Sequence, residues 1–148
     1  IKNGERTESL VYLNDVFPTV ADIVGIEKPE TIDGLSLLPI LNDSKATVRE
    51  SVYFSYKNFQ RGVRTKNWKL IKYLVEGKKT TQLFEIKKDL LEMNNLANDS
   101  KYKKKVKEMT VLLQEWLNKS GDKVQLDKPD WNVKVIKSWV TDRKEKDK

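Results

Sequence analysis

Four short segments rich in β-forming residues follow one another between residues 52 and 86, with very little chain between them. The segments read VYFSY, RGVRT, WKLIKYLV and TQLFEI and begin at Val52, Arg61, Trp68 and Thr81. The connections contain turn-forming residues at Lys57-Asn58, Lys66-Asn67 and Glu76-Gly77-Lys78. Parallel neighbours need a crossover of about a dozen residues, so connections this short allow only antiparallel pairing. The sequence therefore predicts a four-stranded antiparallel sheet.

The third segment places apolar side chains on both faces of this sheet. One face would carry Trp68, Leu70 and Leu74, and the other Ile71, Tyr73 and Val75. A sheet that is apolar on both faces is covered on both. One cover follows in the chain, because apolar residues recur at helical spacing between the possible caps Asp99 or Ser100 and a stop near Gly121. They are Val106, Met109, Leu112, Leu113, Trp116 and Leu117.

The two ends of the chain differ from this central part. Residues Thr7 to Leu13 are strand-like, and Asn14 and Asp15 can cap a helix that would stop at Gly25. A loop with one helical turn would follow over residues 27–41. The remainder from residue 124 fits helical and strand spacing equally well, so we expect an edge strand or an irregular packed arm, frayed after residue 142.

These elements together predict an α+β fold. A strand and helix come first, then the antiparallel sheet with a long C-terminal helix packed on it. The polar stretch NDSKAT separates the two parts, which gives residues 1–47 and 48–148.

Composition excludes several kinds of chemistry. The 148 residues include no histidine and no cysteine, so these residues cannot provide an imidazole base, a thiolate metal site or a serine triad of the usual kind. No apolar run approaches the roughly 18 residues of a membrane span. The net charge of +7 comes from scattered lysine runs interleaved with acids, which is typical of solvated helix faces and, without a recognisable motif, does not indicate nucleic-acid binding.

The acids occur mostly singly, so a metal or acid–base site is not favoured. Asp15, Asp89 and Asp99 lie where local hydrogen bonding requires caps and turns, and we expect them to serve there.

The segment FSYKNFQRGVRT contains the most site-like group of residues. A hairpin here would present Asn58, Phe59, Gln60 and Arg61, which offer two amides, an aromatic ring and a guanidinium. Such a set could hold an anionic or sugar-like ligand. An exposed turn with arginines on the strand faces is the simpler alternative, because loops gather polar residues anyway.

Four stretches occur in a fixed order, and a long helix ending in Trp follows them. They are LNDVFPTVADIVGI, DGLSLLPIL, RGVRTKNWKLIKY and QLFEIKKDLLEMNNLA. Together they resemble the C-terminal region of the type I sulfatases, which belong to the alkaline-phosphatase-like superfamily. The match runs from Ile1 to about Leu117, and four motifs in one order and spacing make it specific. The chain departs from the family pattern at Glu85, where aspartate is usual, and at Leu90, where proline is usual.

The resemblance also implies a role for the polar segment after the last strand. Its matching residues would tie that strand to the long helix by side-chain to backbone hydrogen bonds, with Leu96 as an apolar plug. The residues are Asp89, Glu92, Asn95 and Leu96.

The resemblance implies a sulfuric ester hydrolase whose catalytic centre lies outside these residues. The family uses a divalent cation, Ca²⁺ or Mg²⁺, and a formylglycine made from the Cys or Ser of a C/S-x-P-S/A-R motif, which this sequence lacks. We therefore expect no catalytic or metal-binding residue here and no activity from this chain alone. Residues 1–47 would complete the catalytic domain, which precedes this chain and is its main partner. The second sheet face would dock there, and the Asn58 to Arg61 hairpin could line a pocket for a sulfated small molecule or glycan.

Other expectations remain open at this point. Left uncovered, the apolar sheet face would promote self-association. The net charge suggests, as an alternative, a non-catalytic module that binds polyanions or glycans, and the same subdomain occurs in related phosphate and phosphonate monoester hydrolases. The resemblance also implies a periplasmic or secreted location.

Overall fold

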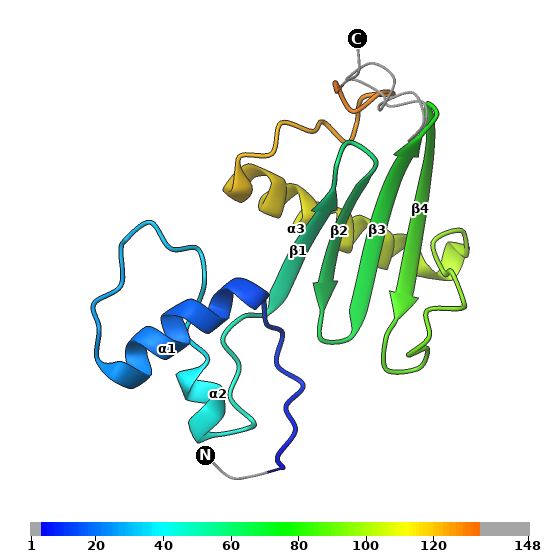
Figure 1. Cartoon of the computed structure of the whole chain (residues 1–148). Helices are drawn as coiled ribbons and strands as arrows, with labels where there is room; N and C mark the ends of the chain where they lie inside the picture. Colours follow the sequence, from blue (N-terminus) through cyan, green and yellow to red (C-terminus); the bar gives the residue numbers. More distant parts are fainter. Residues whose placement is uncertain (1–3, 134–148) are drawn as a thin grey trace, which may run out of the picture. The chain divides into compact units, whose positions relative to one another are not determined.

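The computed structural model describes residues 4–133 and shows two compact units, with the boundary after Val52 (Figure 1). The first unit contains a 3₁₀ turn, η1 (Leu13–Asp15), and the helices α1 (Val16–Val24) and α2 (Leu38–Asn42). The chain continues with β1 (Ser51–Tyr56), β2 (Gln60–Thr65), β3 (Trp68–Val75), β4 (Lys78–Glu85), the 3₁₀ turn η2 (Ser100–Tyr102) and α3 (Lys103–Ser120). Among the described helices, none has the length and apolar character needed to cross a membrane.

Helix α1 follows the predicted pattern. It ends at Gly25, whose φ of 72° lies in the left-handed region that glycine adopts without a steric penalty. Pro18 lies in the first turn, where its missing N–H breaks no helical hydrogen bond. Pro18, Thr19 and Ala21 are buried, whereas most of the larger apolar side chains of α1 are exposed.

The strand expected over residues 7–13 does not form. Residues 5–12 have no regular secondary structure, and none of them joins the described sheet. A strand requires a neighbouring strand with which to pair. Here backbone groups form hydrogen bonds with side chains instead. The Tyr12 N–H donates to the Asp15 carboxylate (2.6 Å), and the Leu10 carbonyl accepts from Arg49 (3.4 Å). The prediction of a leading strand is therefore wrong, because β-forming side chains alone do not supply a ladder partner.

The predicted antiparallel sheet is confirmed, with its strands in the order β1-β2-β3-β4 (Figure 1). The register pairs Val63 with Leu70 and Leu70 with Leu83, so these three side chains form a row across the sheet. Strand β4 begins at Lys78, earlier than expected, because its pairing with β3 continues up to the turn after Val75.

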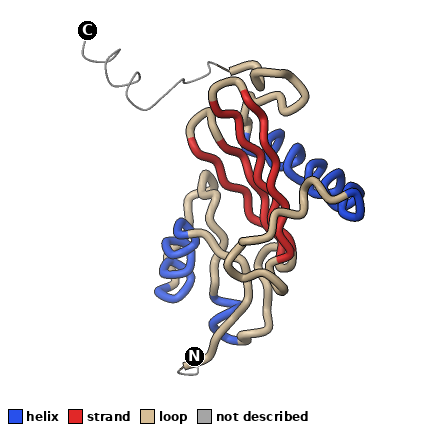
Figure 2. The backbone as a smooth tube through the Cα atoms, turned by 90° about the vertical axis from the view of Figure 1, so that its right-hand side faces the viewer, coloured by secondary structure: helices blue, strands red, loops and turns tan. Residues whose placement is uncertain are grey.

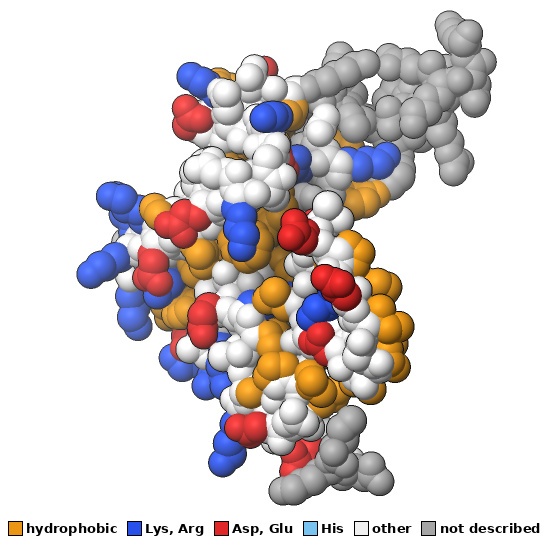
Figure 3. All heavy atoms as spheres, turned by 90° about the vertical axis from the view of Figure 1, so that its left-hand side faces the viewer, with side chains coloured by type: hydrophobic (Ala, Val, Ile, Leu, Met, Phe, Trp, Pro, Cys, Tyr) orange, Lys and Arg blue, Asp and Glu red, His pale blue; other side chains and the backbone are white. Residues whose placement is uncertain are grey.

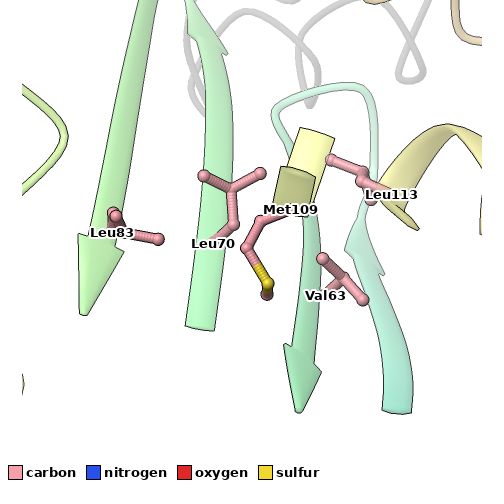
Figure 4. Packing of buried hydrophobic residues seen from close by; sticks show 5 residues of the cluster. All are labelled: Val63, Leu70, Leu83, Met109 and Leu113. Carbon is pink, nitrogen blue, oxygen red and sulfur yellow. The ribbon is translucent and has the colours of Figure 1, made fainter. Parts of the chain in front are cut away.

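Helix α3 covers one face of the sheet, as predicted (Figure 2). Its Met109 and Leu113 lie against the row formed by Val63, Leu70 and Leu83, and none of the five is more than 1% exposed (Figure 4). The helix ends at Gly121, again in the left-handed conformation (φ 68°). The core of this unit therefore lies between α3 and the three strands β2, β3 and β4.

The opposite face of the sheet is closed at its centre. Ile71, Phe84 and Ile86 are only 4–5% exposed, and the aromatic side chains of Phe54 and Tyr73 pack against them. The apolar patch expected on this face is therefore reduced, because Phe54 and Tyr73 cover its centre, while these two side chains stay partly exposed and Val75 is exposed. Self-association through this face stays a prediction.

The chain after α3 forms an irregular packed arm, one of the two predicted alternatives. Val124 and Trp131 join Leu74 and Leu117 in a second buried cluster. No helix or strand is present over residues 122–133. The predicted fraying after residue 142 lies outside the described residues.

Asn95 fixes the segment between β4 and α3 to the sheet. Its Oδ1 accepts from the N–H groups of Leu83 and Ala97, each at 3.0 Å, and its Nδ2 donates to the Thr81 carbonyl (3.1 Å). Leu96 donates its N–H to the Leu83 carbonyl (2.9 Å) and packs against the α3 core. The predicted side-chain to backbone clasp, with Leu96 as its apolar plug, is confirmed at these two residues.

The acidic part of this segment follows the prediction only in part. The Asp89 carboxylate accepts from the N–H groups of Met93 (3.0 Å) and Asn94 (2.8 Å), as expected for a turn. Glu92 instead forms a salt bridge with Lys69 of β3 (2.6 Å). Its carboxylate thus reaches a charged side chain on the sheet and not a backbone N–H.

Candidate functional site

The hairpin between β1 and β2 carries the residues that the sequence singled out. Asn58 and Phe59 lie in the turn, Gln60 begins β2, and all three are partly exposed. The Phe59 ring stacks on Tyr56, with 6.4 Å between centroids, and the Phe59 carbonyl accepts the Leu74 N–H (2.8 Å). The structure therefore brings an aromatic ring and two amide side chains together at this end of the sheet.

Arg61, the fourth predicted site residue, is buried, and its guanidinium forms hydrogen bonds with other groups of the protein. Only 6% of the residue is exposed. Its Nε donates to Asp122 Oδ2 (2.7 Å), and its Nη1 donates to the carbonyls of Lys57 (2.6 Å) and Gln60 (2.8 Å). The guanidinium thus holds the turn to the arm after α3, and the Asp122 carboxylate balances its charge.

The Asp122 carboxylate is the centre of a buried polar network. Besides Arg61 it accepts from the Tyr53 hydroxyl (2.7 Å) and from the Val124 N–H (3.0 Å). Burial alone would raise the pKa of Asp122, but these donors outweigh it and hold the pKa below its ordinary value. Burial and the hydrogen bond to Asp122 raise the pKa of Tyr53 to about 12. A carboxylate kept ionised beside a phenol kept protonated is suited to structural support and not to proton transfer near neutral pH.

Sequence reasoning missed the partner of Arg61. Asp122 is 61 residues away in the chain, and its only local signal is its place directly after the helix-ending Gly121. The substrate-binding role of the hairpin stays a prediction. Its exposed part consists of Asn58, Phe59 and Gln60, with Arg61 holding the turn behind them.

The first unit contains a second buried ion pair, at Asp15. The carboxylate is fully buried and pairs with both terminal nitrogens of Arg49, with 2.7 Å between Oδ1 and Nη2. It also accepts from the N–H groups of Tyr12 (2.6 Å) and Leu35 (2.9 Å). Burial would raise the pKa of Asp15, but the bonds from Arg49, Tyr12 and Leu35 lower it below the ordinary value.

The capping expectation for Asp15 is met in part. Its side chain makes no capping bond to α1, but its carboxylate accepts the N–H of Tyr12, the residue that caps η1. The pairing of the same carboxylate with Arg49 was not expected. Asp99 does cap as predicted, since its carboxylate accepts the Lys101 N–H (2.9 Å).

The residues present do not fit the cofactors that the resemblance implies. Over residues 4–133 no group of three or more acidic, histidine or cysteine side chains is placed to hold a metal ion. The sequence also lacks the motif from which formylglycine is made. No catalytic step is therefore assigned to these residues.

Comparison with known proteins identifies a family. Residues 1–119 match the family model described as N-sulphoglucosamine sulphohydrolase, C-terminal. The N-acetylglucosamine-6-O-sulfatase of Bacteroides thetaiotaomicron is 33% identical over 126 residues, which cover 78% of this chain and 22% of that protein. The chain thus spans about a fifth of the length of that relative.

Solved structures share the arrangement of sheet and helix. A protein solved in complex with its substrate D-glucosamine-2-N,6-O-disulfate superposes with a TM-score of 0.67 at 31% identity, covering 80% of this chain and 25% of that chain. The phosphonate monoester hydrolase of Agrobacterium radiobacter superposes with a TM-score of 0.52 at 21% identity, covering 69% and 24%. That second likeness shows a shared fold and nothing more.

Proposed function

This chain belongs to the sulfatases, in the family of the N-sulphoglucosamine sulphohydrolase C-terminal region, and we propose that it is the C-terminal subdomain of an enzyme that hydrolyses sulfate esters of sugars. The family match over residues 1–119 carries this proposal. Two of the similar proteins are named for a sulfated glucosamine, either as the group acted on or as the bound substrate. A sulfated amino sugar is therefore the substrate class that we propose.

Within such an enzyme the hairpin would contact the sugar. Amide side chains can donate to and accept from hydroxyl groups, and an aromatic ring gives an apolar face for a pyranose. Asn58, Phe59 and Gln60 provide these groups, while Arg61 holds the turn through two backbone carbonyls. Their role is to position substrate, and the reacting groups would come from elsewhere in the enzyme.

The exposed apolar side of the first unit is the surface that we propose seats against the catalytic part of the enzyme. Figure 3 shows hydrophobic side chains gathered along the right-hand edge of the view. Seven large apolar residues of η1, α1 and the turn after it are 51–90% exposed. They are Leu13, Val16, Phe17, Val20, Ile23, Val24 and Ile26. A continuous surface of this kind is typical of an interface, and it is also where self-association of the isolated chain would occur.

The chemistry of that enzyme is also a proposal. A formylglycine and a Ca²⁺ or Mg²⁺ ion would supply the nucleophile and the sulfate-binding charge, and residues outside this chain would hold them. An exported location, periplasmic or secreted, belongs to the same proposal.

The test uses the whole enzyme that contains this chain. We expect it to release sulfate from N-acetylglucosamine-6-sulfate, and we expect the 148-residue chain alone to release none. Hydrolysis of phosphonate or phosphate monoesters without sulfate release would overturn the proposed function.

The hairpin is tested by Asn58→Ala combined with Gln60→Ala, which should raise KM about tenfold with little change in kcat, because binding contacts are lost and the reacting groups are kept. Asn67→Ala, in the exposed turn between β2 and β3, is the matched control and should leave KM unchanged. An unchanged KM in the double variant would contradict the pocket role of the hairpin and leave the sulfatase proposal intact.

A further inference from the structure

The positive charge of the chain is concentrated in the second unit. Residues 1–52 contain 5 Lys and Arg against 9 Asp and Glu, whereas residues 53–148 contain 24 against 13. The overall charge of +7 is therefore the sum of −4 and +11. An asymmetry of this size creates a local positive field that the net charge understates.

Five lysines of the second unit occur within seven residues at the start of α3. They are Lys101, Lys103, Lys104, Lys105 and Lys107. Only Lys105 has a carboxylate partner, because its Nζ binds both oxygens of Glu108 at 2.6–2.7 Å and lies 5.5 Å from the centre of the Trp68 ring. The other four are exposed, and no carboxylate of residues 4–133 forms a salt bridge with them.

Helix stability does not explain these lysines. The first turn of α3 contains no acidic residue. Cations at the N-terminal end oppose the helix macrodipole, and the like charges of Lys103 and Lys107, four residues apart, repel each other. The sequence therefore maintains a charge arrangement that is unfavourable for the helix itself, and this points to an external anion.

The lysines lie on the part of α3 that faces away from the sheet. Met109, Leu113 and Leu117 occupy the buried side of α3 against the sheet. Lys104 and Lys107 lie on the opposite side of the helix, with Lys103 at its edge, one helical turn or about 6 Å from Lys107. Figure 3 shows several Lys and Arg side chains along the left edge of the view, with Asp and Glu side chains among them. The nearest acid on that side, Glu108, is neutralised by Lys105.

We propose that Lys103, Lys104 and Lys107, with Lys101 beside them, bind a sulfated glycan chain by electrostatic contact. Lysine ammonium groups on flexible side chains suit an anion whose sulfates vary in position. They act as point charges, whereas the planar guanidinium of arginine requires a fixed bidentate geometry. A nucleic acid fits less well, because Tyr102, the aromatic ring next to these lysines, already packs against Trp68 (5.9 Å between centroids) and has Lys101 over it (5.6 Å). The choice of sulfate as the anion rests on the proposed function, while the basic surface rests on the residues themselves.

The test measures binding and not hydrolysis. A fluorescein-labelled heparin oligosaccharide is titrated with the chain, with its Lys103→Gln/Lys104→Gln/Lys107→Gln variant, and with a control variant, Lys78→Gln/Lys123→Gln/Lys128→Gln. Both variants lose three positive charges from exposed lysines of the same unit, so the change in net charge is matched. Affinity is followed by anisotropy between about 50 and 200 mM salt, the range over which contacts to polyanions weaken strongly.

We expect the first variant to lose at least about tenfold in affinity and the slope of log affinity against log salt to become shallower by about 2. The control should keep the slope and lose less than about threefold. Equal losses in the two variants, or none in either, would overturn the proposal. Equal affinity for unsulfated hyaluronan, or for duplex DNA with the same dependence on these lysines, would overturn the assignment to sulfate.

These outcomes also separate the inference from the function on which it rests. If the whole enzyme releases sulfate but the lysine variant binds normally, the inference alone fails. If the lysines bind the sulfated oligosaccharide but the enzyme cleaves no sulfate ester, the binding surface stands and the proposed function fails.

Discussion

Replacement of Asp122 by alanine tests the buried network that supports the hairpin. Asp122→Ala leaves the Arg61 guanidinium without its counterion, in a place where only 7% of that side chain reaches solvent. It also removes the acceptor of the Tyr53 hydroxyl and of the Val124 N–H. The substitution therefore removes four hydrogen bonds to three residues at once, and the turn loses the charge that fixes its arginine.

The magnitude follows from the burial of the pair. Removal of one partner of a buried ion pair costs roughly 3–5 kcal/mol. The Asp122 side chain is 17% exposed, so some water reaches the pair and we expect the low end, about 3 kcal/mol. With a urea m value of about 2 kcal/mol per M, the unfolding midpoint should fall by about 1.5 M. Asp122→Ala combined with Arg61→Met should recover much of this loss, because the stranded charge is gone.

Tryptophan fluorescence is the appropriate signal. All four tryptophans lie in residues 53–148, so emission follows the second unit alone. Asp127→Ala is the control, since Asp127 lies on the same arm with a side chain that is 76% exposed. A midpoint for Asp122→Ala within about 0.3 M of the control would refute the reasoning, because a buried charge cannot lose its partner at so small a cost.

Three further predictions concern packing, the clasp and titration. Gly62→Ala should destabilise by about 1–3 kcal/mol in thermal melts, because its Cβ would lie 2.3 Å from the Phe54 ring, and Phe54→Leu should relieve the loss. Asn95→Ala should cost about 1–3 kcal/mol by urea unfolding through its lost backbone bonds, whereas Asn94→Ala should cost little. The free energy of unfolding should decline between pH 10.0 and about 12, because Tyr53 loses its proton in the unfolded chain before it does so in the folded one. Tyr53→Phe should reduce this decline, measured as urea midpoints across that pH range. An equal decline in the variant would refute the role of Tyr53.

The parts of the fold that the sequence predicted depend on local patterns. Short connections force antiparallel pairing, and a stripe of apolar residues every three or four positions defines the covered side of α3. Asn95 was predicted as part of a clasp because the order of motifs placed it there, and the structure confirms its bonds to β4. Such features need only residues that are near one another in the chain.

The features that the sequence did not predict depend on partners far along the chain. Asp15 meets Arg49 across 34 residues, and Arg61 meets Asp122 across 61. An acid next to a helix is read most simply as a cap, and an arginine in a strand as a surface charge. Only the folded chain shows that Asp15 is buried against Arg49 and that Arg61 is buried against Asp122. The expected strand before Asp15 failed for the same reason, because its backbone groups form hydrogen bonds with side chains.

The Arg61 network makes the position of the hairpin depend on the arm after α3. Arg61 binds the Lys57 and Gln60 carbonyls, which flank Asn58 and Phe59, and Asp122 fixes Arg61. A turn held in this way loses little conformational freedom when it contacts a ligand, because its backbone is already ordered. Within the proposed function, loss of Asp122 should therefore raise KM for a sulfated sugar in the whole enzyme, and Arg61 would act on substrate only through the turn that it holds.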